Sequence, residues 1–313
     1  MLATHKLVPM FGECKVNVNS DILFPANMYW KHDKRYQHDD EQDINWDDKD
    51  DMLVWRGVTS GGTAFDDEYH PWWQMHRQRL VMITNSTALS DNTTSILARD
   101  TTGKVEGTYA VNDNWQPAAF AKEHTDIGFT EKTACLPNCG FCKDTFTMVN
   151  QTTFADTFKS KYLIDVDGHS FSGRWRAFLQ SRSLGLKATI FREWHDSHLW
   201  AWRHFVPVDN RYDDMYSLLT YFIGTPSDPG SDEGVDDEVA IRVPCHDYEA
   251  FKLAKQGRDW AAKLLGREAI EIYLYRLLLE YARIVDDNRD RIGFVGDGGH
   301  ETEEFDRRVP AVN

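Results

Sequence analysis

The sequence predicts an α/β protein whose C-terminal half is built around a parallel sheet. Three observations support this fold class. Apolar strand patterns alternate with helical patterns from residue 161 onward, the chain of 313 residues is long enough to bury a sizeable core, and 41% of its residues are hydrophobic. Strands that alternate with helices typically form a parallel sheet with right-handed crossovers.

The first half of the chain contains fewer regular patterns. Residues 51–57, DMLVWRG, have the composition of a strand, and residues 71–83, PWWQMHRQRLVMI, predict a helix. The acidic stretch from Asp39 to Asp51 is expected to be a solvated loop. Residues 86–160 are rich in Thr, Asn and Asp and predict loops and short strands, so the boundary between domains is expected there.

The second half carries the alternating patterns. The run KYLIDVDG predicts a buried strand, GRWRAFLQSRS a helix, and LGLKATIF and WRHFVPVD two further strands. Two helical patterns close the chain, DYEAFKLAKQGRDWAAKLL and AIEIYLYRLLLEYARIVDD. The Tyr273 to Tyr281 series in the last of them is spaced as a buried helical stripe.

Charge and hydropathy exclude several classes of protein. Acidic residues outnumber basic ones 50 to 35, and the net charge of -15 argues against a general nucleic-acid binder, which needs a basic surface. An anionic ligand must therefore meet a local basic pocket. No apolar run reaches the length of a membrane span, and the N-terminal residues lack the apolar stretch of a signal peptide.

Cysteines and sequons point to an oxidising compartment. Cys135, Cys139 and Cys142 share one short loop, which predicts a disulfide from Cys135 to Cys139 or Cys142. A zinc site would need a fourth ligand from Cys14, Cys245 or a histidine. Three N-x-S/T sequons are candidates for N-glycosylation: Asn85, Asn92 and Asn150. Together these features favour the lumen of the secretory pathway, in conflict with the missing signal peptide.

The segment DGHSFSGR follows the first strand of the C-terminal half and resembles a phosphate-binding turn. In parallel sheets, ligands bind outside the carboxyl ends of the strands, where the next helix presents free N–H groups. Gly168 and Gly173 would let the backbone approach a ligand, Ser170 or Ser172 would cap the helix, and Arg174 would bind phosphate oxygens. An ordinary Asp-Gly turn before a capped helix has the same pattern, so both readings stay open here.

A family resemblance becomes specific at these residues. The stretch from Tyr162 to Phe222, the later VPCHDYEAFKLAKQGRDWAAKLL and YLYRLLLEYARIVDDNR, and the upstream NSDILFPANMYW, LVWRGVTSGG and HRQRLV occur in the same order as in one enzyme family. They resemble the capsule-associated-protein type glycosyltransferases of family ninety, which include fungal xylosyltransferases and Rumi-type protein O-glucosyltransferases. The similarity covers nearly the whole chain and is weakest from about 86 to 155.

The resemblance implies a GT-B arrangement of two Rossmann-like domains that face each other across a cleft. The expected organisation is a partial N-terminal, acceptor-side domain at 1–120, a Cys-containing connecting region at 121–155, a UDP-sugar-binding Rossmann-like domain at 156–285 and a tail at 286–313. The implied reaction is inverting transfer of glucose or xylose from a UDP-sugar to a hydroxyl of a glycan or glycoprotein. No cofactor or divalent metal is expected, because arginines would stabilise the leaving diphosphate. Asp165 and Asp167 have the spacing of a metal-binding motif, but they are interpreted as structural residues at a strand end and turn.

The resemblance also implies donor contacts. Ser172, Gly173 and Arg174 would hold the diphosphate, next to Gly168. Arg56 matches a family arginine near the donor; its alternative is stacking on Trp55 or pairing with the acidic loop. Glu193 would accept hydrogen bonds from ribose hydroxyls; its alternative is an acid at the start of a helix. His204 would lie near the uracil or ribose edge; its alternative is a structural histidine.

The catalytic base is not assigned within the chain. In the family's glucosyltransferases this role belongs to an Asp upstream of the segment matching DILFPANMYW, and no residue before Ser20 matches that motif. We therefore expect a truncated family member that binds the donor and transfers poorly, from a protein of the Golgi or endoplasmic reticulum lumen with a membrane anchor upstream. The alternatives are a non-catalytic UDP-sugar or carbohydrate-binding remnant and, more distantly, a structural zinc protein.

Overall fold

The computed structural model describes residues 8–31, 33, 36–65, 68–99, 108–140, 145–225, 243–289 and 291–292. The chain divides into two compact units, residues 1–267 and 268–313. The first unit holds the sheet and the helices packed on it. The second holds most of helix α8, Arg267–Val285.

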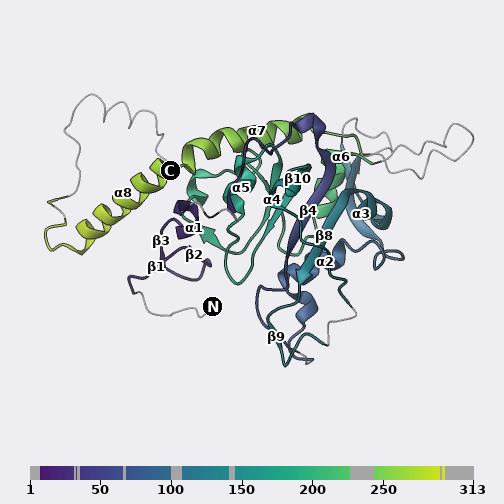
Figure 1. The fold of residues 1–313 in the computed structure, drawn as a ribbon, viewed down its shortest axis with the longest axis horizontal. Coiled ribbons are helices and arrows are strands. Elements are labelled where there is room, and N and C mark those ends of the chain that lie inside the picture. Colours follow the sequence, from purple (N-terminus) through teal and green to yellow (C-terminus); the bar gives the residue numbers. More distant parts are fainter. Residues whose placement is uncertain are drawn as a thin grey trace, which may run out of the picture. The chain divides into compact units, whose positions relative to one another are not determined.

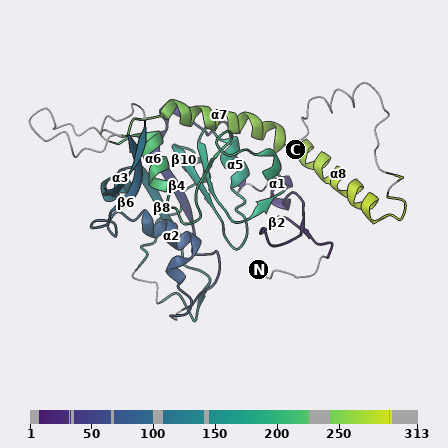
Figure 2. The ribbon, with the colours of Figure 1, turned by 180° about the vertical axis from the view of Figure 1, so that it is seen from behind.

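The core of the first unit is a five-stranded parallel sheet with the order β13-β11-β10-β4-β8 (Figures 1 and 2). Its strands are β4 Asp50–Val58, β8 Thr125–Glu131, β10 Ser160–Val166, β11 Leu184–Ala188 and β13 Val206–Pro207. Counted along the chain, this order is 2-1-3-4-5, the doubly wound arrangement in which the first strand and the third lie side by side. The parallel α/β sheet predicted from the alternating patterns is thus present.

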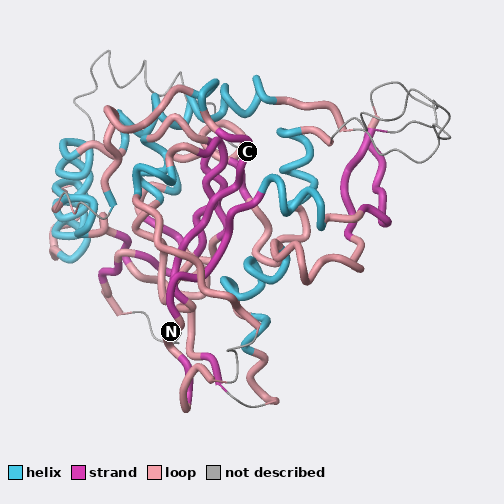
Figure 3. Tube along the Cα trace, turned by 45° about the vertical axis from the view of Figure 1, so that its right-hand side comes forward, coloured by secondary structure: helices cyan, strands magenta, loops and turns pink. Residues whose placement is uncertain are grey.

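The sequence explains why these strands are central. Every residue of β10 is buried, as is each residue of β11, because parallel strands covered on both faces bury both sets of alternating side chains. β4 and β8 come from the stretches expected to form the N-terminal domain and the connecting region. In the structure they pair in the same sheet as β10, β11 and β13. Strands are drawn in magenta in Figure 3, where several run side by side near the centre.

Helices lie at both ends of the sheet as well as on its faces. α2, His76–Ile83, lies by the carboxyl ends of the strands, whereas α7, Asp247–Leu264, begins by their amino ends (Figure 1). α5, Trp175–Gln180, packs against α7 and β11, and α6, Met215–Ile223, packs against β6 and α7. The shorter helices of the first unit are α1 Asn27–Trp30, α3 Ala118–His124 and α4 Phe154–Thr157, with 3-10 turns at Trp46–Asp48, Trp72–Gln74 and Asp196–His198.

Four two-stranded pairings complete the fold of the first unit. β6 Thr94–Arg99 and β7 Tyr109–Trp115 form an antiparallel ribbon, and β2 Cys14–Lys15 runs antiparallel to β12 Arg192–Glu193. β1 Phe11–Gly12 pairs with β3 Ile22–Leu23, and β5 Ala64–Phe65 pairs with β9 Cys135–Leu136, both in parallel. The β2–β12 pair ties the N-terminal segment to the loop after β11.

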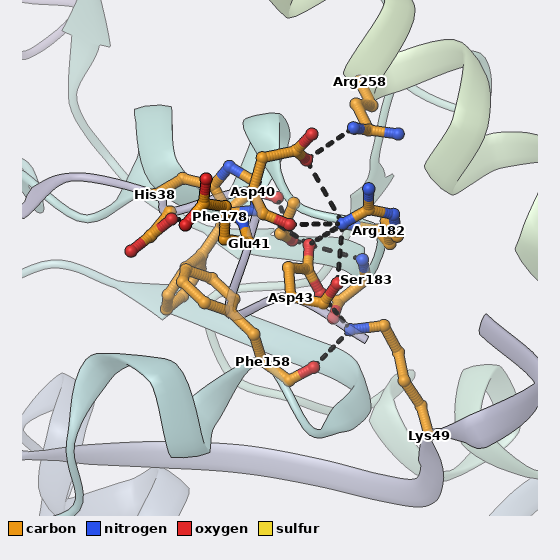
Figure 4. A network of polar contacts seen from close by, with 12 residues as sticks. His38, Asp40, Glu41, Asp43, Lys49, Phe158, Phe178, Arg182, Ser183 and Arg258 are labelled. Atoms are coloured by element: carbon orange, nitrogen blue, oxygen red, sulfur yellow. Dashed lines mark hydrogen bonds and ion pairs between the residues drawn. The ribbon is translucent and has the colours of Figure 1, made fainter. Parts of the chain in front are cut away.

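The acidic stretch is partly buried, so the prediction of a wholly solvated loop is wrong. The Asp43 side chain is fully buried and accepts hydrogen bonds from Lys49 Nζ at 2.5 Å and from the Arg182 backbone N–H at 2.6 Å, with His38 Nε2 at 2.8 Å (Figure 4). Lys49 also donates to the Phe158 carbonyl. Burial would raise the pKa of Asp43, but the hydrogen bonds from His38 and Lys49 lower it overall. This network joins the segments that enter β4, β10 and β11.

Helix α8 carries apolar side chains that are exposed in the structure, among them Ile272, Tyr275 and Leu278. The buried stripe predicted for Tyr273 to Tyr281 is therefore not formed within the described residues. No helix among those residues combines the length and the apolar character needed to cross a membrane.

Candidate functional site

The sheet order places a switch point between β4 and β10. The chain leaves β4 through Thr59, Ser60, Gly61 and Gly62, and it leaves β10 through Asp167 and Gly168; in doubly wound sheets, ligands bind outside this edge. Gly61 and Gly62 have φ angles of 118° and 138°, which L side chains rarely adopt. A Cβ on Gly61 would lie 3.5 Å from the Gly168 carbonyl oxygen, so the two loops approach closely.

Arg77 of α2 joins these two loops with its guanidinium. Its Nε donates to the Asp167 carbonyl at 2.8 Å, and its Nη1 donates to the Val58 carbonyl at 3.0 Å and to Ser60 Oγ at 2.7 Å. Burial and then the charge of Arg174 lower the pKa of Arg77 to about 10, so the group is still a cation at neutral pH. The carboxyl end of the switch point thus contains a fixed positive charge.

Arg174 brings a second cation to the same place. It precedes α5, donates from Nη1 to the Arg56 carbonyl at 2.5 Å, and lies 5.6 Å from the centroid of the Trp55 ring. Arg77 lies 5.3 Å from the same ring. Burial lowers the pKa of Arg174, while the Asp165 carboxylate opposes that effect. Because the charge of Arg174 lowers the pKa of Arg77, the two cations interact, and an anion bound beside them would be stabilised by both.

Gly168 and Gly173 each lie close to the far end of a flexible side chain. A Cβ on Gly168 would lie 3.0 Å from Arg77 Nη2, whereas a Cβ on Gly173 would lie 2.2 Å from Met28 Sδ. Gly168 therefore belongs to the loop that contacts the arginines. Gly173 is fixed by contact with α1.

Ser172 does not cap helix α5. The helix begins at Trp175 and has Arg174 at its N-cap position with no side-chain capping bond, so the predicted capping by Ser170 or Ser172 is wrong. Ser172 is buried and hydrogen bonds to the Asp165 carboxylate instead. The helix accordingly starts two residues later than its sequence pattern predicts.

The Arg56 side chain is turned to the neighbouring strand. Its Nη2 donates to both oxygens of Asp126 on β8, the strand that pairs with β4, at 2.5 and 2.6 Å. Pairing with an acid was one of the alternatives for Arg56, although the partner is Asp126 rather than the acidic loop. Its backbone carbonyl nevertheless accepts the hydrogen bond from Arg174.

Glu193 lies in a buried polar cluster, not at the start of a helix. Its carboxylate accepts hydrogen bonds from Lys187 Nζ at 2.9 Å and Tyr29 Oη at 3.1 Å, and His195 Nε2 lies 3.3 Å away. Burial opposes the charge of Glu193, but Lys187 and His195 lower its pKa to about 2. With 2% of its surface exposed, Glu193 orders the β2–β12 region and has no oxygen turned to solvent.

His204 lies at the wrong edge of the sheet for a nucleotide contact. β13 begins at Val206, so His204 precedes the strand and lies by its amino end. The ring stacks on Trp200 and Trp260, with centroids 5.6 and 5.4 Å away, and Nδ1 accepts the Trp200 backbone N–H at 3.2 Å. These contacts agree with a structural role for His204, which was the alternative to a nucleotide contact.

Sequence reasoning missed Arg77 and the Ser60–Gly62 turn. One signal was available in the α2 pattern, because the apolar residues of HRQRLVMI are consecutive and form no apolar face to predict which side is buried. In α2, Arg77 and Gln78 are buried while Met82 is exposed. The adjacent glycines after a strand were the second signal.

The structure forms a disulfide between Cys135 and Cys139, one of the two pairings that the sequence left open. Cys142 lies outside the described residues. Asn85, Asn92 and Asn150 are all exposed. Across the described ranges, no group of three or more His, Cys, Asp or Glu side chains is arranged to hold a metal ion.

Comparisons with known proteins support a glycosyltransferase. Residues 131–227 match the model of Glycosyl transferase family 90, a segment that includes Arg174 but not Arg77. The chain is 28% identical over 130 residues to Protein O-glucosyltransferase 3 of Mus musculus, and to the same extent to that of Homo sapiens. It is 25% identical over 138 residues to Protein O-glucosyltransferase 2 of Danio rerio.

These alignments are partial. They cover 41% of this chain against the mouse protein and 44% against the zebrafish protein. The matched stretch spans only 22% and 23% of those relatives, respectively. The similarity is therefore distant and regional.

Proposed function

We propose that this chain binds a UDP-sugar at the carboxyl ends of β4 and β10 and acts as the donor-binding part of a glycosyltransferase of the capsule-associated-protein type. The observation that carries the proposal is the pair of guanidinium groups, Arg77 and Arg174, on the Trp55 ring. A diphosphate is the anion that such a pair suits, because arginine forks match phosphate oxygens. The glycines in the turns beside the two arginines leave room for the protein backbone to contact the diphosphate.

The proposed reaction is transfer of glucose or xylose with inversion. An acceptor hydroxyl oxygen attacks the anomeric carbon, the bond from that carbon to the diphosphate breaks, and the electron pair leaves with UDP. The hydroxyl proton passes to a base. Arg77 and Arg174 would stabilise the charge that develops on the diphosphate, which lowers the barrier without a covalent intermediate.

We propose further that donor binding needs no divalent ion. The β10 end carries Asp165 and Asp167, the only acidic pair there with metal-motif spacing. Asp167 already accepts hydrogen bonds from Thr189 Oγ1 at 2.5 Å and from the Ile190 N–H at 2.8 Å. Asp165 is buried and interacts with Ser172 and Lys187. These protein partners support a structural role for both carboxylates.

In the whole protein, we propose a GT-B pair of domains, a glycan or glycoprotein acceptor, and residence in the Golgi or endoplasmic reticulum lumen. The disulfide between Cys135 and Cys139 and the exposed sequons at Asn85, Asn92 and Asn150 support the lumenal compartment.

Titration calorimetry with UDP in the presence of EDTA tests the donor site. We expect binding, and we expect Arg174→Ala to weaken it by roughly 1.5 to 3 kcal/mol, the range for a hydrogen bond to a charged group. Arg258→Ala is the matched control, because Arg258 pairs with Asp40 through a salt bridge and lies on α7. Equal UDP affinity for Arg174→Ala and the control would remove Arg174 from the site.

Transfer is tested separately with UDP-glucose and UDP-xylose, each offered with a saccharide and a glycoprotein acceptor. Sugar incorporated into an acceptor, and lost in Arg174→Ala, supports the enzyme. UDP binding without transfer from either donor supports the alternative, a non-catalytic donor-binding remnant.

A further inference from the structure

A cavity lies near the amino ends of the sheet, away from the switch point. It has a volume of about 760 Å³ and is lined by residues of α6, α7, the β6–β7 ribbon and the loop before β13. α7 begins at Asp247, which accepts a hydrogen bond from Lys161 at the start of β10. The volume falls within the range of roughly 300 to 1,000 Å³ that is typical of small-molecule sites.

Aromatic side chains form part of the cavity lining, and one of them stacks on a neighbouring ring. Tyr109 and Trp202 line the cavity with 41% and 54% of their surfaces exposed. The Trp202 backbone has a φ of 63°, and its N–H donates to the Phe205 carbonyl at 2.8 Å. Tyr221 stacks on His246 with the ring centroids 4.0 Å apart. A ring stacked in this way loses little freedom when a ligand binds.

Apart from Ser217, whose Oγ accepts a hydrogen bond from the Leu97 N–H at 3.0 Å, four polar side chains line the cavity: Arg203, Glu249, Lys252 and Gln256. Within the part of the chain that the structure describes, none of these side chains makes a hydrogen bond or ion pair. The Arg203 guanidinium lies 5.1 Å from the centroid of the Trp200 ring. The cavity therefore offers free donors and a free acceptor beside apolar ring faces.

We propose that this cavity binds a neutral oligosaccharide. A pyranose has apolar C–H faces that stack on aromatic rings, and its hydroxyl groups both donate and accept hydrogen bonds. The positive charges of Arg203 and Lys252 are partly offset by Glu249, and a purely apolar ligand would use none of these polar groups. A saccharide is the ligand class that uses both the rings and the mixed polar groups.

This inference does not depend on the proposed donor site, because the two sites share no residues. A saccharide held near the amino ends would tether a larger glycan or glycoprotein to the molecule. Tethering raises the effective concentration of the rest of that molecule around the protein.

The test uses xylotriose, mannotriose and maltotriose as probes of the full chain, with saturation-transfer NMR and titration of tryptophan fluorescence. We expect at least one probe to bind, and Tyr109→Ala and Gln256→Ala each to weaken that binding by roughly tenfold, equivalent to about 1.4 kcal/mol. Tyr248→Ala is the matched control, since Tyr248 is an exposed tyrosine of α7 outside the lining. Two variants on different elements keep the test valid if one fails to fold.

Saturating UDP and Arg174→Ala separate this site from the donor site. Saccharide binding that persists under both conditions supports the proposal even if UDP itself does not bind. Three results would overturn it: no binding of any probe at millimolar concentration, saccharide binding lost with Arg174→Ala, or binding of an apolar dye in the cavity while all three saccharides fail.

Discussion

Arg77 donates a hydrogen bond from Nε to the backbone carbonyl of Asp167 at 2.8 Å, which joins α2 to the carboxyl end of β10. Arg77→Lys keeps the charge but cannot reproduce the bonds to Asp167, Val58 and Ser60 together. We expect a loss of about 2 to 4 kcal/mol in the free energy of unfolding, since buried carbonyls lose their donors. Urea denaturation measures it.

The control for Arg77→Lys is Arg258→Lys, which changes a half-exposed arginine in a surface pair. That variant should change stability by less than about 1 kcal/mol. If both variants lose the same small amount, Arg77 does not hold the two loops together.

Asp43 and Asp40 provide a matched pair in the network of Figure 4. Both contact Arg182, but the Asp43 side chain is fully buried whereas that of Asp40 is 60% exposed. Asp43→Asn leaves Lys49 buried without its anionic partner, so we expect it to cost about 3 kcal/mol. Asp40→Asn should cost less than about 1 kcal/mol. Thermal and urea unfolding measure the two losses of stability. Equal losses for Asp43→Asn and Asp40→Asn would contradict the prediction.

Asp167 should make stability depend on pH. Burial raises its pKa from 3.8 to about 6 in the folded protein, against the hydrogen bonds from Thr189 and Ile190. The folded state therefore binds a proton more tightly than the unfolded chain, and this contribution is lost as pH rises from about 4 to about 6.

Asp167→Asn removes that contribution. The stability of the native sequence minus that of the variant should fall by up to about 3 kcal/mol across the same pH window, at about 1.4 kcal/mol per pKa unit. Urea titrations at several pH values measure it, with the exposed Asp91→Asn as control. A difference that stays constant with pH would show that Asp167 keeps an ordinary pKa.

Cys135 and Cys139 should remain linked in protein made through a secretory route. Non-reducing peptide mapping should yield one peptide pair that contains these two cysteines. Because the bridge closes a short loop, Cys135→Ser should cost no more than about 2 kcal/mol. A Cys135–Cys142 peptide, or free thiols at all five cysteines, would contradict the pairing in the structure.

Local pattern was enough to predict the sheet strands of the C-terminal half. The apolar runs of β10 and β11 are continuous because both faces of these strands are covered, and that information is carried within a few residues. The β4 strand and the two long helices at the C-terminal end were likewise predicted from patterns of neighbouring residues. The position of Gly168 directly after a buried strand also identified one loop of the candidate site.

Other features depend on partners far away in the chain. Ser172 could have capped α5, but the buried Asp165 carboxylate lies within its reach. Arg77 looks like any charged helix residue until β4 and β10 lie side by side and present Val58 and Asp167 carbonyls to it. His204 sits by the amino end of β13 because that strand starts only at Val206.

The sequence by itself thus determined the α/β class, the main strands and one loop of the candidate site. Only the tertiary structure decided that Arg77 and Arg174 lie on the same Trp55 ring, and that Glu193 is buried against Lys187. The physical reason is the distance along the chain over which each effect acts. Hydrophobic periodicity acts between near neighbours in the chain, whereas a side chain's hydrogen-bond and ion-pair partners are chosen by the order in which the strands of the sheet come together.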